Sequence, residues 1–394
     1  MELTVQALVI GGGAVGCCLA RDLALRGVSV CLLERGDLAS GTTGHAHGLL
    51  HSGARYVTDD PAVARECAAE NAVIRRIAPH CIEDTGGLFL VLDVRAELLF
   101  QPAFLAGCRD AGIPYEELDH RAVLQAEPLV APNVHRAFRV QDAVLDAWRF
   151  CVANVLDAQD HGAWAFRGVA VDALLRNGDR IAGATGRNSI TLQPYTLHAE
   201  CVVNAAGAWA GQVGALAGVD VPLAPNKGVL VAMARRPVTH VLHNCRPPSD
   251  GDIVVPDGTR VVVGTTATPA AGPDDTAVPE GVPAALVDQA IRLTPVLREI
   301  EVERSWAAIR PLTPSSPTAA TGQDGRTLSR DYRLLDHAVD DAVGGFVTIV
   351  GGKLTTARLM AEAAADLVCA KLGVAAPCRT ADEPLPGAEA RRLR

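Results

Sequence analysis

The first 34 residues carry the pattern of a dinucleotide-binding βαβ unit, which constrains the fold more than any other part of the chain. An apolar, β-branched run over 3–10 predicts a strand, and glycines in the spacing G-x-G-x-x-G follow at 11–16. A helix is expected next, then a second strand over 28–33 that ends at Glu34. Such a turn brings a pyrophosphate to the helix N-terminus, and the acid accepts hydrogen bonds from a ribose with a free 2′-hydroxyl. We therefore expect an α/β protein with a dinucleotide cofactor that lacks a 2′-phosphate.

The segment that follows, GTTGHAHGLLHSGARY at 41–56, combines four glycines with three histidines and an arginine. Glycine lets the backbone approach a flat ligand closely, and packing alone does not explain so many polar side chains. We expect an aromatic, reactive ligand over this segment. His45, His47 and His51 have the spacing H-x-H-x₃-H, but no nearby cysteine or carboxylate completes a metal site, so we expect no metal.

Length and composition indicate a soluble, cytoplasmic enzyme of two domains. A chain of 394 residues is too long for one ordinary core, and no apolar run approaches the length of a membrane span. The N-terminus enters the first strand without a signal peptide. The 11 cysteines lack CxxC spacing, which favours reduced, packed thiols, and the net charge of −9 disfavours nucleic-acid binding.

A second strand–glycine–helix element lies near the C-terminus, where an apolar strand over 346–350 precedes GGKLTT and a long helix. We infer that one Rossmann-like domain is assembled from distant segments and that the middle of the chain supplies an antiparallel sheet. Separate strands are expected at 190–197 and 201–204, and helices at 101–112 and 284–297. The expected organisation is a discontinuous cofactor-binding domain over 1–84, 145–215 and 320–372, a substrate or cap domain over 85–144 and 216–319, and a tail over 373–394.

Motifs that occur in order along nearly the whole chain are similar to those of one known family. They are GGGAVG (11–16), GTTGHAHGLLHSGARY (41–56), RECAAEN (65–71), NAAGAWA (204–210), KGVLV (227–231), IRPL (309–312), SRDYRLLDH (329–337) and GGKLTTARLMAE (351–362). On these segments the chain resembles the FAD-dependent glycerol-3-phosphate dehydrogenases of the D-amino-acid-oxidase-like superfamily, and in particular the catalytic polypeptide of the anaerobic bacterial enzyme. HGLLHSGARY, SRDY and GGKLTT are far more specific signals than the glycine fingerprint.

The resemblance implies FAD as cofactor and oxidation of sn-glycerol 3-phosphate to dihydroxyacetone phosphate by hydride transfer to flavin N5. It implies that the flavin lies over the loop that begins at Thr42, with the GGKLTT turn closing on its pyrimidine end. The implied substrate-binding residues are Arg55, Tyr56, Arg310, Arg330 and Lys353, and the implied catalytic residues are His51, Arg310 and Lys353. The implied cofactor-binding residues are Gly11, Gly13, Ala14, Val15, Gly16, Glu34, Arg35, Thr42, Thr43, His47, Gly48, Leu49, Val171, Ala206, Gly207, Trp209, Gly351, Gly352, Lys353, Leu354 and Thr355.

The sequence departs from the family pattern in three places. His45 and Ala46 stand where the catalytic chains of the anaerobic enzymes typically have Arg-Asn, and Val229 with Leu230 stand where some relatives carry a histidine that is a candidate base. Those chains also continue into a cysteine-rich iron–sulfur domain, whereas this sequence stops after PCRTADEPLPGAEARRLR. We therefore expect electrons to leave to a quinone, an artificial dye, oxygen or a separate partner subunit. Peripheral association with the inner face of the membrane is one arrangement that would allow this.

The basic residues suit a phosphate monoester, because arginine offers paired N–H donors to its oxygens. Structural alternatives remain open for two of them. Arg55 is also able to pair with Glu66 or Asp59, and Arg330 with its neighbour Asp331 in a surface turn.

Two further residues of the proposed site have more than one interpretation. Lys353 binds the phosphate, stabilises negative charge at the reduced flavin, or is a helix-start lysine in solvent. His51 is either the acceptor of the substrate hydroxyl proton or a residue whose hydrogen bond holds the flavin loop.

Three other functions remain open from the sequence. The same fold could oxidise another 2-hydroxy acid, phosphorylated alcohol or amine, which a test of phosphate requirement would distinguish. A flavoprotein could relay electrons or scaffold a complex without its own substrate, although the intact set of basic residues argues against this. A nicotinamide dehydrogenase would need no flavin, so the colour of the protein separates it from the others.

Overall fold

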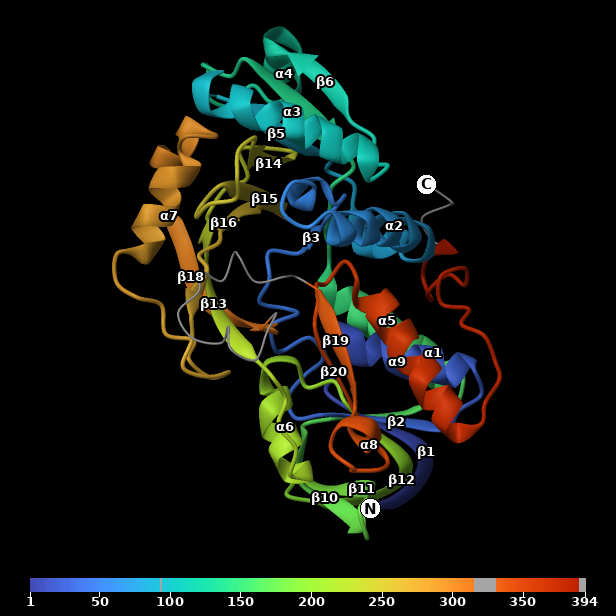
Figure 1. Ribbon diagram of the computed structural model, residues 1–394. Helices are drawn as coiled ribbons and strands as arrows, with labels where there is room; N and C mark the ends of the chain where they lie inside the picture. Colours follow the sequence, from blue (N-terminus) through green and yellow to red (C-terminus); the bar gives the residue numbers. More distant parts are fainter. Residues whose placement is uncertain (93, 315–330, 390–394) are drawn as a thin grey trace.

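The computed structural model describes residues 1–92, 94–314 and 331–389. Two large sheets and one small sheet organise this part of the chain. Figure 1 shows the first sheet, which contains the N-terminal strand, at the lower end of the view, and the second sheet in the upper half. Residues of both sheets line one cavity.

The first sheet holds the βαβ unit that the sequence predicts. Its strands run in the order β10-β11-β12-β1-β2-β9, and β20 pairs with β12 and with β19. The strands β12, β1, β2 and β9 are parallel, whereas β11 is antiparallel to both of its neighbours. The bounds are β1 (Glu2–Ile10), β2 (Val30–Glu34), β9 (Trp164–Arg167), β10 (Val169–Asn177), β11 (Arg180–Asn188), β12 (Pro194–Asn204), β19 (Tyr332–Asp336) and β20 (Phe346–Gly351).

One prediction in this sheet is wrong. The sequence predicts separate strands over 190–197 and 201–204, but β12 is continuous because it pairs in parallel register with β1 from Thr196 to Asn204. Ile190 lies instead in an exposed turn, where the Asn188 side chain accepts hydrogen bonds from the next backbone N–H groups. Short-range hydrogen bonds of asparagine compete with strand pairing, and here they end β11.

Three helices from distant parts of the chain cover one face of the first sheet. They are α1 (Ala14–Leu25), α5 (Ala147–Asp160) and α9 (Ala357–Leu372), and Figure 1 shows them side by side. Their apolar side chains, such as Leu19, Phe150 and Val368, form one buried cluster with Val9 and Val203 of the sheet. The shorter helix α6 (Ala210–Ala217) adds Ala217 to the cluster on the opposite face.

The second sheet is mixed, and most of its strand pairs are antiparallel. Its order is β17-β13-β16-β15-β14-β5-β7-β6, with β18 paired to β13. The one parallel pair is β5 with β14, among the described strands. The bounds are β5 (Gly87–Val91), β6 (Glu116–Asp119), β7 (Arg136–Val140), β13 (Ala224–Met233), β14 (Val241–Asn244), β15 (Ile253–Asp257), β16 (Arg260–Gly264), β17 (Thr268–Pro269) and β18 (Val302–Leu312).

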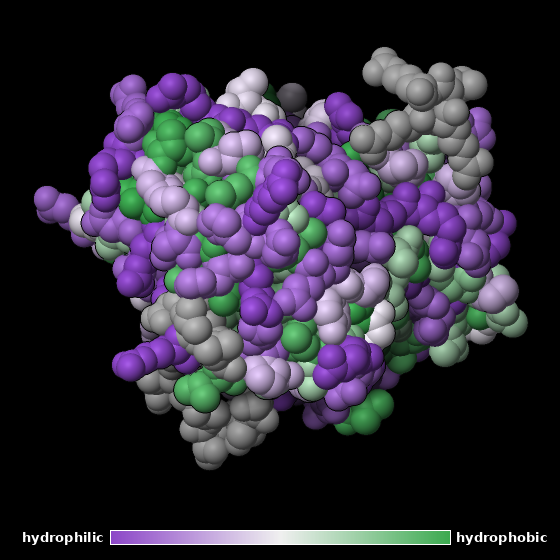
Figure 2. All heavy atoms as spheres, turned by 90° about the horizontal axis from the view of Figure 1, so that it is seen from above, coloured by the Kyte–Doolittle hydropathy of each residue, from purple (hydrophilic) through white to green (hydrophobic). Residues whose placement is uncertain are grey.

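Helices pack on both sides of the second sheet. They are α7 (Val282–Ala290), α3 (Val94–Asp110) and α4 (His120–Ala126). The expected helix over 284–297 is two elements, because α7 ends at Ala290 and a 3₁₀ turn follows at Pro295–Glu299. Seen from the α3–α4 end, the surface has apolar side chains set among polar ones (Figure 2).

Shorter elements join the two large sheets. The small sheet consists of β3 (Leu49–Leu50), β8 (Ala143–Leu145) and β4 (Ile82–Glu83). Beside it lies α2 (Pro61–Ile77), while α8 (His337–Asp340) precedes β20. The strands of the first sheet come from residues that are expected in the cofactor-binding domain, and those of the second sheet come from residues that are expected in the cap domain. The boundaries of the two domains stay a prediction.

Within the described residues, none of the helices combines the length and the apolar character that crossing a bilayer requires. All 11 cysteines are free thiols, and all except the half-buried Cys378 are buried.

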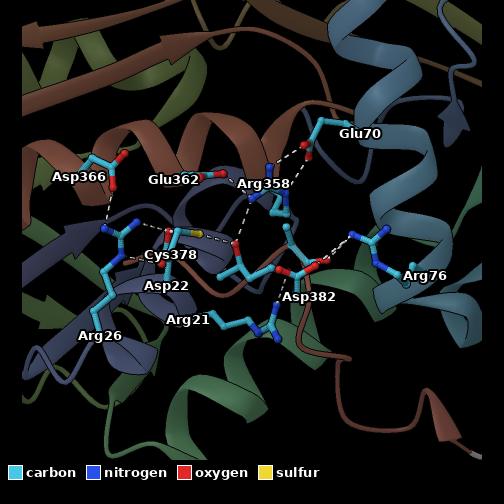
Figure 3. A network of polar contacts seen from close by, with 12 residues as sticks. Arg21, Asp22, Arg26, Glu70, Arg76, Arg358, Glu362, Asp366, Cys378 and Asp382 are labelled. Atoms are coloured by element: carbon cyan, nitrogen blue, oxygen red, sulfur yellow. Dashed lines mark hydrogen bonds and ion pairs between the residues drawn. The ribbon is translucent and has the colours of Figure 1, made fainter. Parts of the chain in front are cut away.

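A buried ionic network ties the C-terminal segment to α1, α2 and α9 (Figure 3). Arg358 of α9 donates to both carboxylate oxygens of Glu70 in α2, at 2.9 and 2.5 Å, and also to Glu362 and Thr380. Arg21 of α1 pairs with Asp157 of α5 and donates to the Glu383 carbonyl. Charges taken out of water need such partners, because an unpaired buried charge is strongly destabilising.

We expect Glu70→Gln to lower the free energy of unfolding by about 3–5 kcal/mol, since it leaves the Arg358 guanidinium buried without its main counter-charge. The side chains of this pair are only 5% and 3% exposed. Urea denaturation followed by circular dichroism measures the change. The matched control is Arg187→Met, which breaks a surface pair with Asp172 whose side chains are 60% and 45% exposed, and should cost less than about 1 kcal/mol. Equal losses in the two variants would contradict the assignment.

Candidate active site

A cavity of about 1090 Å³ lies at the carboxyl ends of β1 and β2 and extends to the second sheet. Its lining comes from the glycine turn at 11–15, the loop over 40–56, the strand β18 and the turn after β20. This volume is at the upper end of the range for small-molecule sites, roughly 300–1,000 Å³. Ligands of open α/β sheets bind at this edge, so the cavity lies where the βαβ pattern predicts a site.

The glycine turn leaves no room for side chains. A Cβ at Gly11 would lie 2.5 Å from the Ala205 carbonyl oxygen, and one at Gly16 would lie 1.9 Å from the carbonyl oxygen of Gly11. Gly11 also has φ of +117°, which only glycine adopts readily. The first turn of α1 therefore presents its backbone N–H groups to the cavity, and Thr43 accepts one of them, from Ala14, at 3.1 Å.

The acid at the end of β2 lies beside this turn. The carboxylate of Glu34 accepts hydrogen bonds from the backbone N–H groups of Gly12 at 2.7 Å and Gly36 at 2.6 Å. Next to it, the Arg35 guanidinium lies 4.0 Å from the ring centroid of Trp209, a favourable cation–π distance. These side chains line one end of the cavity.

The other end of the cavity is lined by later residues of the loop over 40–56, among them His51, Arg55 and Tyr56. His51 is 7% exposed, and its Nε2 lies 3.4 Å from the Tyr56 hydroxyl, with the two rings edge to face. The backbone N–H of His51 donates to Thr355 Oγ1 at 3.1 Å, so the turn after β20 holds this loop. The ring faces the cavity and is also part of a hydrogen-bonded loop, so both interpretations of His51 fit the geometry.

Burial keeps His47 and His51 neutral. Burial and, to a smaller extent, the nearby positive charges of Arg310 and Arg55 lower the pKa of His47 to about 3. Burial also lowers the pKa of His51 well below its usual value, against an opposing effect of Asp142. A neutral imidazole has a free ring nitrogen that accepts a proton or a hydrogen bond.

Three basic side chains converge on the same end of the cavity. Arg55 donates to the buried carboxylate of Asp252 at 2.9 Å, not to Glu66 or Asp59. The Lys353 ammonium lies 5.2 Å from the ring centroid of Tyr56, so it is not a helix-start lysine directed away into solvent.

The third basic side chain, Arg310 of β18, is held in place by neutral acceptors. It donates to Asn226 Oδ1 at 2.7 Å, to Thr265 Oγ1 at 2.8 Å and to the Thr266 carbonyl at 3.0 Å. A Cβ at Gly228 would lie 2.4 Å from its Nη2, so only glycine leaves room for it. The predicted residue Arg330 lies outside the described residues.

The cavity brings together most residues expected to bind the cofactor. Those that line it are Gly11, Gly13, Ala14, Val15, Glu34, Arg35, Thr42, Thr43, His47, Leu49, Val171, Ala206, Gly207, Trp209, Gly351, Gly352, Lys353 and Leu354. Three expected residues do not line it. Gly16 packs against the backbone of Gly11, Gly48 approaches the Leu145 carbonyl, and Thr355 is fully buried behind His51.

The sequence alone did not predict the residues that hold Arg55, Arg310 and His51 in place. They are Asp252 behind Arg55, Asn226 and Thr265 beside Arg310, and Asp142 with His243 behind His51. Asn226 directly precedes the KGVLV motif, which is the one signal that pointed to it. Among the residues that the structure describes, no three histidine, cysteine or acidic side chains are grouped to hold a metal ion.

We expect the protein to lose stability as the pH falls below about 6.5, because His47 has a folded-state pKa of about 3 and must be kept neutral when folded. The contribution of this residue is complete above the pKa of the unfolded chain and decreases as the pH falls toward the folded value. His47→Gln should therefore reduce the loss of unfolding free energy between pH 7 and pH 5 by on the order of 1 kcal/mol. Urea titrations at both pH values measure it. His135→Gln, at an exposed position, is the control, and an equal reduction there would contradict the prediction.

Comparison with known proteins gives consistent matches over the whole chain. A family model described as "FAD dependent oxidoreductase" matches residues 6–367. The A1 polypeptide of the anaerobic glycerol-3-phosphate dehydrogenase of Haloferax volcanii is 43% identical over 99% of this chain and 67% of its own length. The A polypeptide of the Escherichia coli K12 enzyme of the same name is 44% identical over 98% of this chain and 70% of its own. A solved structure, glycerol-3-phosphate dehydrogenase from Bacillus halodurans complexed with FAD, superposes with a TM-score of 0.74 at 25% identity, over 99% of this chain and 70% of that one.

Proposed function

This chain belongs to the family of FAD dependent oxidoreductases, and we propose that it oxidises sn-glycerol 3-phosphate to dihydroxyacetone phosphate with FAD as its cofactor. The observation that supports this most directly is the convergence of Arg55, Arg310 and Lys353 beside His51, at the end of the cavity opposite the glycine turn. The relatives that are 43–44% identical to this chain match it over almost its full length, and both are named as anaerobic glycerol-3-phosphate dehydrogenases.

The residues of the cavity fit FAD. The glycine turn has no Cβ atoms at the place where the pyrophosphate of FAD would approach the N-terminus of α1. Glu34 lines the cavity next to this turn, where it would accept hydrogen bonds from the ribose of the cofactor. Thr42, Thr43, Leu49 and the turn at 351–354 also line the cavity. When bound, FAD supplies an acceptor for two electrons and one proton.

The basic residues would recognise the phosphate group. Arginine gives paired N–H donors in a fixed plane, and each charge-assisted hydrogen bond contributes about 1.5–3 kcal/mol. Arg310 is already oriented by Asn226 and Thr265, so little side-chain entropy remains to be lost when a ligand binds. The cluster is local, because the whole chain has a net charge of −9.

His51 is the proposed acceptor of the proton from the substrate hydroxyl. Oxidation of an alcohol carbon removes a hydride and a proton, so a neutral acceptor is needed next to the substrate. The low pKa of His51 keeps its imidazole neutral at neutral pH, and a phosphate dianion in the same cavity would raise that pKa toward the working range.

We propose that electrons then leave to a quinone or to a partner subunit. The support for a partner is that the relatives at 43–44% identity are each named as one subunit of an anaerobic enzyme. Peripheral association with the inner face of a membrane and a cytoplasmic location are part of this proposal.

We expect tightly bound, noncovalent FAD in the purified protein, because the glycine turn and Glu34 line the cavity together. Acid precipitation should release all of the yellow colour into the supernatant, where absorbance and chromatography identify FAD. Colourless protein that FAD does not reconstitute, or colour that stays in the precipitate, would contradict this.

We expect glycerol 3-phosphate to bleach the flavin without oxygen, and glycerol at the same concentration to leave it oxidised. Arg310→Met should lower kcat/KM for glycerol 3-phosphate at least ~30-fold, since losing charge-assisted contacts costs about 2 kcal/mol or more. Stopped-flow absorbance of the flavin measures both. Arg187→Met, on the surface, should have wild-type kinetics. Equal bleaching by the two alcohols would remove phosphate recognition from the proposal.

A further inference from the structure

A buried carboxylate links the loop of His51 to the second sheet. Asp142 lies between β7 and β8 and is 2% exposed. Its Oδ1 accepts the backbone N–H of Ser52 at 2.6 Å, and its Oδ2 accepts the Nε2–H of His243 in β14 at 2.8 Å. Because Ser52 follows His51 directly, one side chain fixes the backbone of the proposed proton acceptor against the second sheet.

His243 is held as tightly as its partner. Its ring is fully buried and stacks on Phe89, with centroids 4.3 Å apart and planes 5° from parallel. Its Nδ1 has no hydrogen-bond partner within the described chain. A Cβ at Gly87 would lie 2.6 Å from Asp142 Oδ2, so the missing side chain of this glycine provides the space that the carboxylate occupies.

Neither Asp142 nor His243 lines the cavity, yet Asp142 affects it electrostatically. Burial opposes its ionisation, but the hydrogen bonds from His243 and Ser52 hold the pKa of its carboxyl at about 2. The charged and titratable groups that face His51 are Asp142, which favours its protonated form, the groups His47, His243 and Arg55, which disfavour it, and the Tyr56 hydroxyl, which lies 3.4 Å from its Nε2. Asp142 is thus the anion that limits the effect of burial on His51.

We propose that Asp142 and His243 are a positioning pair, which orients His51 through Ser52 and sets its readiness to accept a proton. This inference rests on the proposed role of His51 in glycerol 3-phosphate oxidation. In this proposal, Asp142 and His243 contact neither the substrate nor the cofactor. They act through the backbone hydrogen bond and the buried charge.

The chemistry of an amide predicts what Asp142→Asn does. The Ser52 N–H can only donate, so the single amide oxygen stays with it and the NH₂ group faces His243. His243 must then accept at Nε2 and carry its proton on Nδ1, where no partner exists among the described residues. The variant therefore removes the negative charge near His51 and changes the tautomer of His243.

Two variants should move the pH dependence in opposite directions. Asp142→Asn removes the anion, so the pKa of His51 falls and the acid limb of the kcat/KM profile moves to lower pH. His243→Leu removes a donor that neutralises Asp142, so the pKa of His51 rises and the acid limb moves to higher pH. His243→Gln keeps a donor at the position of Nε2 and should restore the wild-type profile.

The experiment measures the FAD-loaded protein in two ways. Stopped-flow reduction by glycerol 3-phosphate from pH 5 to 9 should show opposite shifts in the two variants, and rates at least tenfold below wild type. Histidine-selective ¹⁵N NMR without substrate should show the same opposite shifts in the His51 titration, and the Nδ1–H tautomer of His243 in Asp142→Asn. Glu127→Gln is the matched control, because Glu127 is an equally buried carboxylate that accepts from His240 at 2.7 Å and does not line the cavity.

Shifts in the same direction, no shifts, or equal effects of Glu127→Gln would overturn the positioning pair. A wild-type flavin that glycerol 3-phosphate does not reduce would instead refute the proposed function. In that case the NMR titrations still test the pair, since they need no substrate.

Discussion

The structure depends on the burial of α1 on almost every side. All residues of this helix except Val15 are buried, including Arg21 and Asp22, because β1, α5, α9 and the C-terminal segment surround it. Segments from the beginning, middle and end of the chain must therefore assemble before the helix is covered. The same helix begins at the glycine turn, so the packing that stabilises the first sheet also fixes the N–H groups that face the cavity.

Local patterns in the sequence are enough to predict the parts that form by local rules. The spacing of glycines, the apolar run of β1 and the acid at Glu34 predict the βαβ unit, and the second glycine turn after β20 predicts that distant segments share one sheet. The separate strands expected around residue 200 are wrong, because the length of β12 is set by pairing with β1 and not by its own composition. Tertiary pairing overrides local propensity in such strands.

In the candidate site, too, local sequence patterns do not predict contacts between residues that are far apart in the chain. Motifs identify Arg55, Arg310 and Lys353, but not the partners that orient them. Asp142 lies 90 residues from Ser52 and 101 from His243, and Arg55 lies 197 residues from Asp252. Nothing in the sequence near these residues distinguishes them from other acids and histidines, so only the fold reveals which of them meet.

Gly228 has a consequence for how sequences of this kind diverge. Its missing Cβ is the space that the Arg310 guanidinium fills, although the two residues lie on different strands. A side chain at 228 would force the Arg310 guanidinium to move, and Thr265 Oγ1, 2.6 Å from the same point, also limits the space there. The two positions should therefore change together during evolution, and a homologue that has lost the glycine should also have lost this placement of the arginine.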